Sequence, residues 1–141
     1  MKSNLLTRIV FLLAFLFTPG VVFAGDIVVI TSPGTAINSL SAKDVRNIYL
    51  GRIKNVNNVT VTPVDLTEET PARAQFMTKI INKSPRQFKS HWVRLVFSGK
   101  ASPMPVVESE QEVIDWVLKN AGGIGYISES AITNAVKVIY K

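Results

Sequence analysis

One continuous stretch, Ile48 to Phe76, constrains the fold more than any other part of the chain. It opens with the end of a helix, where Gly51 can adopt the left-handed conformation that terminates helices. The alternating run Val59 to Asp65 then predicts a strand, and Thr70-Pro71 predicts the N-cap and first residue of another helix. A strand that leads into a helix N-terminus leaves backbone N–H groups unpaired at one place. In α/β folds this is where ligands, anions above all, bind, although an ordinary connection is the alternative.

The rest of the chain alternates between strand and helix patterns. Asp26 to Thr31 is a short apolar run, typical of a strand that is covered on both faces. Serine caps followed by an acid or glutamine at the third helical position predict three helix starts, at Ser41, Ser84 and Ser109. Two late strands are predicted at Ile124 to Ser128 and Val136 to Tyr140. The alternation predicts an α/β domain with a mixed, mostly parallel sheet flanked by helices.

The helix predicted after Ser84 has an apolar stripe and a basic surface. The stripe is Phe88, Trp92, Leu95 and Val96, and its helical spacing predicts that it faces the core. We therefore expect Trp92 to be structural and not a platform for a ligand. The basic residues around the start of this helix predict a solvated face or, as the alternative, a docking surface: Lys79, Lys83, Arg86 and Lys89.

The first 24 residues have the pattern of an export signal. Basic residues precede the apolar run Ile9 to Phe17, and Val22-Phe23-Ala24 offers small side chains where a signal peptidase would cut. The apolar core is shorter than the roughly 20 residues of a membrane-spanning helix, and Pro19-Gly20 interrupts it. We therefore expect cleavage after Ala24, a periplasmic mature protein, and a single domain over residues 25–141.

Charge and cysteine content exclude several kinds of site. The formal net charge is +6, and removal of Lys2 and Arg8 with the signal lowers it to +4. In an exported protein such a mild excess favours small anions or anionic surfaces over nucleic acid. Because the chain has no cysteine, it has no disulfide, no thiolate metal site and no cysteine nucleophile.

Catalytic patterns are absent from the sequence. His91 is the only histidine and has no obvious acidic neighbour. Asp65, Glu68 and Glu69 form an acidic cluster that could bind a hard cation such as calcium, although acids at the start of a helix also offset its dipole. We therefore expect a non-enzymatic protein without a metal or cofactor. A metal-assisted hydrolase that uses Asp65 and Glu68 is a less favoured alternative, since no histidine accompanies them.

Two stretches resemble the periplasmic phosphate-binding proteins of ABC transporters. Ile48-Tyr-Leu-Gly-Arg-Ile-Lys-Asn-Val-Asn is similar to that family's Ile-Phe-Leu-Gly-Lys-Ile and the Trp-Asn turn that follows it. Val117-Leu-Lys-Asn-Ala-Gly-Gly-Ile-Gly-Tyr-Ile is similar to its late helix, which ends in Gly-x-Ile-Gly-Tyr-Val. Both stretches belong to the second lobe of a normally two-lobed protein. The resemblance therefore implies a single lobe of the periplasmic-binding-protein type, as in the small phosphate-transporter-like proteins.

The resemblance also implies a phosphate-binding loop, which this chain has altered. In the family, the strand matching Val61 to Val64 leads into Arg-Ser-Asp-Gly-Ser-Gly-Thr, which holds phosphate. Here Asp65 stands where the arginine would be, and Glu68-Glu69-Thr70 stands where Ser-Gly-Thr would be. Only Thr70 is carried over. Arg73, one turn into the predicted helix, is placed to replace the missing positive charge.

The predicted ligand site lies at one edge of the domain, formed by residues 32–35, 67–73 and 122–126. Its candidate ligand-binding residues are Ser32, Thr35, Thr67, Thr70 and Arg73. The predicted function is non-enzymatic recognition of a small anion, or of a membrane transporter or sensor partner, by an exported domain of the substrate-binding-protein type. A pure protein-interaction accessory without a small ligand is the alternative, and a homodimer is a further candidate assembly.

Overall fold

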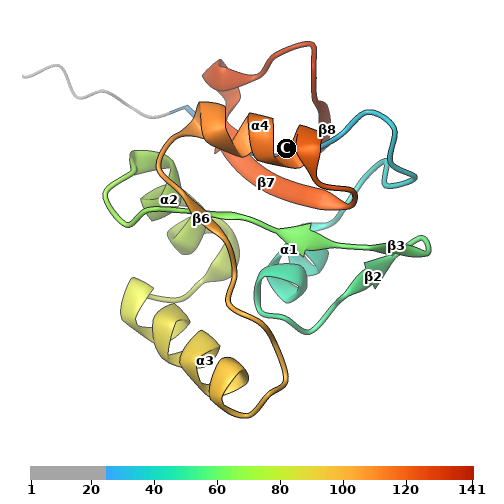
Figure 1. Cartoon of the computed structure of the whole chain (residues 1–141). Helices are drawn as coiled ribbons and strands as arrows, with labels where there is room; N and C mark the ends of the chain where they lie inside the picture. The colour runs from blue at the N-terminus through green and yellow to red at the C-terminus, as the bar shows by residue number, and fades with distance from the viewer. Residues whose placement is uncertain (1–24) are drawn as a thin grey trace, which may run out of the picture.

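A four-stranded sheet forms the centre of the molecule (Figure 1). The structure is a computed structural model that describes residues 25–141, so the predicted export signal lies outside the described part. The sheet has the order β4 (Thr62–Pro63), β7 (Gly123–Ser128), β1 (Ile27–Thr31) and β8 (Lys137–Tyr140). Every residue of β1 and β7 is buried, as the apolar run at β1 predicted.

The sheet is mixed, as predicted, but it is not mostly parallel. β4 pairs with β7 in parallel, whereas β1 pairs antiparallel with both β7 and β8. The continuous apolar run of β1 was a sign of burial on both faces, and covering helices produce that burial whatever the direction of the neighbouring strands. The run therefore predicted the environment of β1 correctly and its pairing wrongly.

Helices cover both faces of this sheet. Gly125 on β7 lies against Val113 of α4 (Glu110–Lys119), while the next residue, Tyr126, packs on Phe76 of α2 (Pro71–Phe76). Since successive strand residues point to opposite faces, α4 lies on one face and α2 on the other. Tyr49 of α1 (Ala42–Tyr49) joins the α2 side, and α2 continues into the π-helical turn η1 (Met77–Ile81).

The three predicted serine caps are confirmed. Ser41 and Ser84 each form a complete capping box, with Asp44 and Gln87. The Ser109 side chain also accepts from the third helical amide. The third residue of that helix, Glu112, accepts instead from the backbone N–H of Glu108, so this cap is not reciprocal.

The single strand predicted over residues 59–65 is divided among three sheets. β3 (Val59–Thr60) forms a hairpin with β2 (Asn55–Val56), and β5 (Asp65–Leu66) pairs in parallel with β6 (Val106–Val107). The backbone N–H groups of residues 62 and 64 donate toward β7, whereas those of 65 and 67 donate to residues 105 and 107. The chain thus passes from the central sheet to β6 at Asp65, which brings the β5–α2 connection beside the segment 103–107.

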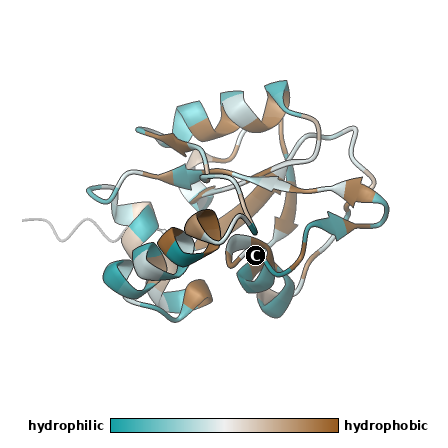
Figure 2. Cartoon of the chain, turned by 60° about the horizontal axis from the view of Figure 1, so that its bottom comes forward, coloured by the Kyte–Doolittle hydropathy of each residue, from teal (hydrophilic) through white to brown (hydrophobic). Residues whose placement is uncertain are grey.

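The helix α3 (Pro85–Phe97) lies to one side of the sheet and carries both hydrophobic and hydrophilic residues (Figures 1 and 2). The stripe predicted to face the core is buried only at Phe88, and Trp92, Leu95 and Val96 are half-buried. Val93 is 46% exposed and Phe97 is 89% exposed. The prediction of a fully buried stripe is therefore wrong, because α3 docks mainly through its first turns.

The two ends of the described chain lie together. The short 3-10 helix η2 (Glu129–Ala131) follows β7, and the Glu129 backbone N–H donates to the Asp26 carbonyl oxygen at 2.7 Å. The Glu129 carboxylate also pairs with the side chain of Lys141, the last residue. Over residues 25–141, no helix has the length and apolar character needed to cross a membrane.

Candidate functional site

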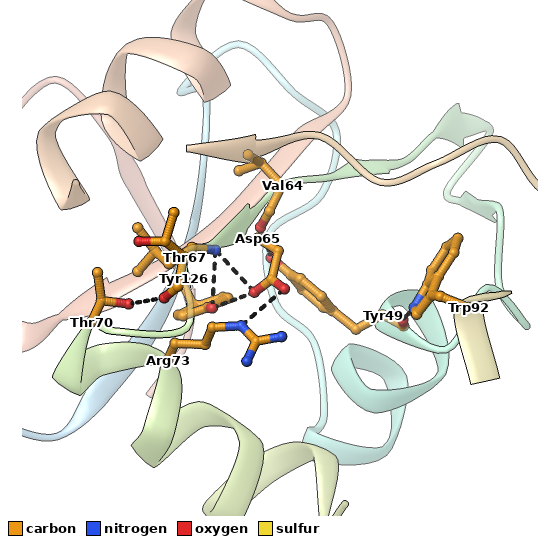
Figure 3. A network of polar contacts seen from close by, with 9 residues as sticks. Tyr49, Val64, Asp65, Thr67, Thr70, Arg73, Trp92 and Tyr126 are labelled. Carbon is orange, nitrogen blue, oxygen red and sulfur yellow. Dashed lines mark hydrogen bonds and ion pairs between the residues drawn. The ribbon is translucent and has the colours of Figure 1, made fainter. Parts of the chain in front are cut away.

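Asp65 and Arg73 form an ion pair inside the domain (Figure 3). The Arg73 Nε donates to Asp65 Oδ2 at 3.1 Å, and only 7% of the arginine side chain and 6% of the aspartate side chain are exposed. The other carboxylate oxygen, Oδ1, accepts from the Tyr126 hydroxyl at 2.5 Å and from the Leu66 backbone N–H at 2.9 Å. The carboxylate that replaces the expected arginine is therefore fully engaged within the protein.

Two buried tyrosines lie near this pair, and one of them, Tyr126, donates to it. The Tyr126 ring stacks on Phe76 with centroids 3.8 Å apart, and Tyr49 meets the same ring edge-on. The Tyr49 hydroxyl donates to the Val64 carbonyl oxygen at 2.9 Å. Burial, with the nearby Asp65 charge as the second cause, raises the pKa of both Tyr126 and Tyr49 well above its usual value. Both hydroxyls consequently keep their protons at neutral pH.

The Arg73 guanidinium has a second, outward side. Its Nε donates to Asp65, and no dashed line in Figure 3 starts from Nη1 or Nη2. Neither of these nitrogens has a hydrogen-bond acceptor within residues 25–141. The guanidinium carbon lies 5.9 Å from the centroid of the Phe88 ring on α3. Arg73 also lines a groove between α3 and the β5–α2 connection. A buried cation with two uncommitted donors therefore faces an open space.

This space, which we call the α3 groove, has a volume of about 570 Å³. One wall is α3, the opposite wall is Leu66 to Glu69, and the segment from Pro103 to Val106 contributes the remainder. Most of the lining is hydrophobic, as these side chains show: Leu66, Phe88, Trp92, Val93, Val96, Phe97, Pro103, Met104 and Val106. The groove thus combines an apolar wall with one buried guanidinium.

Negative and positive side chains lie on different walls of the groove. Glu68 and Glu69 are exposed on the β5–α2 side, and Lys89 is exposed on the α3 side. The described residues contain no group of three or more acidic or histidine side chains that could hold a metal ion. The Asp65 carboxylate is buried against Arg73, whereas Glu68 and Glu69 are exposed, as acids at the start of a helix commonly are.

The N-terminus of α2 offers few amides to an anion. Pro71 has no N–H, and the Thr70 and Arg73 amides donate to the carbonyl oxygens of Thr67 and Thr70. The Thr70 hydroxyl does not cap the helix, because it donates to the Thr67 carbonyl oxygen at 2.8 Å. Thr67 and Arg73 line the groove. The predicted cradle of unpaired amides is therefore mostly occupied by the protein itself.

Ser32 and Thr35 lie toward the opposite end of the sheet from Thr67, Thr70 and Arg73. In the register of β1 and β7, Thr31 is opposite Ile124, so the turn after β1 lies beyond the N-terminal end of β7. β4 runs parallel to β7 and carries the chain toward Asp65 in the other direction. The Thr35 hydroxyl donates to the Ser32 carbonyl oxygen, and Lys137 Nζ donates to the Thr35 carbonyl oxygen at 2.7 Å. The prediction that Ser32 and Thr35 share an edge with Thr67, Thr70 and Arg73 is wrong, because β1 is antiparallel.

His91 and Trp92 hold α3 against the end of α1. The His91 Nε2 lies 2.8 Å from the Leu50 carbonyl oxygen, and the Trp92 Nε1 donates to the Tyr49 carbonyl oxygen at 2.9 Å. Trp92 thus has the structural role that was predicted, but it also lines the groove, so the expectation that it takes no part in a ligand site stays a prediction. Sequence analysis missed the groove itself; the apolar residues beyond the helical stripe, Val93 and Phe97, were the available signal.

Comparison with known proteins relates this chain to solved structures only at the level of fold. No protein-family model matches the sequence, and no curated protein matches it. The chain is similar to an ABC-type phosphate transport receptor from Vibrio cholerae, with a TM-score of 0.63 and 19% identity over 80% of this chain and 44% of that one. A putative phosphate ABC transporter substrate-binding protein from Clostridium perfringens, solved with bound phosphate, gives a TM-score of 0.65 and 19% identity over 80% of this chain and 43% of that one.

PstS from Borrelia burgdorferi is a third such structure, with a TM-score of 0.63 and 18% identity over 81% of this chain and 46% of that one. These similarities confirm the predicted resemblance at the level of fold, and with it the α/β class with a mixed sheet flanked by helices. The chain spans less than half the length of each of these three proteins.

Proposed function

We propose that this chain is an exported, non-enzymatic binding domain whose α3 groove takes an organic monocarboxylate, a molecule with one carboxylate and an apolar body. A binding role is supported by the fold, which the chain has in common with transport receptors and substrate-binding proteins. The small anion expected from the sequence is thus, in this proposal, an organic monocarboxylate.

The observation that carries the proposal is the outward side of Arg73. Its side chain is 7% exposed, yet Nη1 and Nη2 have no acceptor among the described residues and the side chain lines the groove. A guanidinium fork binds the two oxygens of a carboxylate side by side, and such charge-assisted hydrogen bonds are stronger than neutral ones. Asp65 on Nε fixes the plane of the fork, so a ligand meets donors that are already oriented.

The remainder of the groove suits an apolar body. Phe88 contacts the guanidinium, and Trp92, Val96 and Met104 continue the hydrophobic lining away from it. Burial of an aliphatic or aromatic chain on such a wall gains about 25 cal/mol for each Å² removed from water. The hydrophobic lining therefore supplies binding free energy that an inorganic anion could not use.

The charge balance favours one negative charge on the ligand over two. Asp65 already neutralises Arg73, and Glu68 and Glu69 add negative charge at the exposed rim. Like charges about 4 Å apart repel by about 1 kcal/mol in water and by about 4 kcal/mol near a protein surface. Each negative charge on a ligand meets this repulsion, so a phosphate dianion is penalised more than a monocarboxylate.

A protein-interaction accessory, docking on a membrane transporter or sensor without any small ligand, is the second candidate. It is favoured by the exposure of Val93, Phe97 and Val106 around the groove, since clustered exposed hydrophobic side chains mark interaction surfaces.

Titration calorimetry on residues 25–141 tests the proposal, with octanoate and 4-phenylbutyrate as probes and octanamide, phosphate and sulfate for comparison. We expect the carboxylates to bind at least about tenfold more tightly than the amide or the inorganic anions, a difference of about 1.4 kcal/mol or more. Equal binding of octanoate and octanamide, or no binding of either carboxylate at millimolar concentration, would contradict it.

A pair of matched arginine variants assigns the effect to the groove. Arg73→Lys keeps a cation beside Asp65 but removes the fork, so it should weaken octanoate binding at least about tenfold. Arg46→Lys is the control, because the Arg46 Nε donates to the Ile80 carbonyl oxygen and does not line the groove. Melting temperatures of both variants verify that each remains folded.

A further inference from the structure

We infer that a second copy of this chain covers the open side of the α3 groove and completes the binding site. Exposed hydrophobic side chains are concentrated around this groove. Five large hydrophobic residues are exposed in the described part of the chain, and three of them line the groove: Val93 at 46%, Val106 at 57% and Phe97 at 89% exposure. The other two, Leu118 and Ile132, lie elsewhere.

The groove has two chemically different ends. Phe88 and Arg73 are in contact at the end formed by the first turns of α3, and Phe97 is the last residue of that helix. Nine residues separate Phe88 from Phe97, which corresponds to about 13 Å along a helix with a rise of 1.5 Å per residue. A carboxylate at Arg73 and a covering surface at Phe97 therefore occupy different parts of the groove.

The two walls carry opposite charges, which makes the surface complementary to itself. Lys89 is the charged residue of α3 that lines the groove, whereas Glu68 and Glu69 are the charged residues that line it from the facing segment, Thr67 to Thr70. A two-fold axis that runs along the groove places the α3 wall of one copy opposite the acidic wall of the other. The basic α3 wall then meets the acidic wall at two symmetry-related places, one on each side of a shared apolar centre, as an isologous interface requires.

The same two-fold rotation would bury the exposed ring of Phe97. In the monomer this ring is almost entirely in water, while the Met104 and Val106 side of the groove is open beside it. A second copy removes both sets of hydrophobic side chains from water at once, which is the main favourable contribution to association.

This inference rests on the proposed function only for the ligand that the two copies enclose. The groove of a single chain is open to solvent along one side, whereas ligand sites usually bury most of their ligand's surface. The second copy supplies that missing cover over the apolar body, and Arg73 of each copy keeps its own carboxylate.

Sedimentation velocity on residues 25–141, over protein concentrations from about 1 to about 200 μM, measures the assembly. We expect a monomer–dimer equilibrium that Phe97→Asp weakens at least about tenfold, because the new carboxylates would be buried in the apolar centre. Leu118→Asp is the matched control, an exposed hydrophobic residue of α4 outside the groove, and it should leave the dimer unchanged. A strictly monomeric chain over this range, or equal effects of the two variants, overturns the inference.

A charge exchange tests the orientation. Glu69→Lys and Lys89→Glu should each weaken the dimer, and the double variant should restore it, since the swapped charges again face each other. A double variant at least as weak as the single ones overturns the two-fold arrangement.

Octanoate titrations separate this inference from the proposed function. A dimer that binds no octanoate supports the interface and contradicts the proposed ligand. If the monomeric Phe97→Asp variant binds octanoate as tightly as the unmutated dimer, the second copy is not part of the site and the inference fails, while the proposed function stands.

Discussion

Asp65 and Arg73 depend on each other because each is almost completely withdrawn from water. An ion pair in such a place gains little net stability, but loss of one partner leaves an uncompensated buried charge. Tyr126 and the Leu66 amide complete the carboxylate's hydrogen bonds, so this side chain is tied to three parts of the chain. The pair therefore acts as a structural constraint as well as the support of the groove.

Replacement of one partner should be far more damaging than replacement of both. We expect Asp65→Leu or Arg73→Leu alone to lower the free energy of unfolding by about 3 to 5 kcal/mol, and the double variant to lose much less than the sum. Urea denaturation of the four proteins gives the coupling energy. Lys79→Ala is the control, because the Lys79–Asp26 pair is 54% and 76% exposed and should contribute at most about 1 kcal/mol. Additive losses at Asp65 and Arg73 would show that the two residues are not coupled.

The buried tyrosines predict a loss of stability in alkali. Their pKa is raised in the folded protein, so the unfolded chain releases these protons first as the pH rises. Stability from this source is therefore complete below about pH 10 and falls above it, by at most about 1.4 kcal/mol per pH unit for each tyrosine.

Tyr126→Phe should make this alkaline decline shallower, and at neutral pH it should cost about 1 to 3 kcal/mol, because Asp65 loses a hydrogen-bond donor. Denaturation curves between neutral pH and about pH 11 measure both effects. Tyr140→Phe, on β8 and outside the cluster, provides the comparison. An unchanged slope in Tyr126→Phe would contradict this interpretation.

Among the elements, α3 is the one whose attachment depends on few contacts. Phe88 is its only fully buried residue, and the hydrogen bonds of His91 and Trp92 join it to the carbonyl oxygens that end α1. The Leu95 and Trp92 side chains also lie against the position of Gly51, where φ is +70°. An element held in this way opens more easily than the sheet.

Trp92→Ala should therefore loosen α3 before it affects the sheet. We expect a stability loss of about 2 to 4 kcal/mol, and hydrogen exchange that accelerates over residues 85–97 while β1 and β7 remain protected. Ser90→Ala is the matched control, since Ser90 is an exposed residue of the same helix. Uniform acceleration over the whole domain would mean that α3 and the sheet unfold as one unit.

The same elements show what the sequence could and could not predict. Local signals were reliable: the serine caps at Ser41, Ser84 and Ser109 begin helices because each cap needs only its own first turn. Pairing was not predictable, since the antiparallel direction of β1 is set by partners about 100 residues away. That single error moved Ser32 and Thr35 into the predicted site.

The candidate site was predicted only in part for a similar reason. Thr67, Thr70 and Arg73 are close in sequence and stay together, whereas the groove also needs residues 93–106, which only the tertiary fold brings near. Gly122 illustrates the limit well. Its φ is +71°, and a Cβ there would lie 2.0 Å from the Thr60 carbonyl oxygen, a close approach that no local pattern reveals.

For the molecule as a whole, the groove predicts weak binding of phosphate. The α2 amides are largely used, Asp65 neutralises Arg73, and Glu68 and Glu69 add negative charge at the rim. We expect a dissociation constant no tighter than about millimolar, and tighter binding after Glu69→Ser or Glu68→Gly because each removes repulsion. Titration calorimetry measures all three proteins, and micromolar binding by the unmutated chain would contradict this account.

The two ends of the described chain are adjacent, because Glu129 contacts both Asp26 and Lys141. The order of the elements along the chain could therefore be changed without changing how they pack. A short glycine-rich linker could join these ends, and new ends could be opened at Asn57 and Asn58, the left-handed turn residues of the β2–β3 hairpin. Such a circular permutant would begin with β3, which leads through β4 to Asp65, and end with β2, yet keep every contact of the groove. For the same reason the domain could be inserted into a loop of another protein and leave that loop closed.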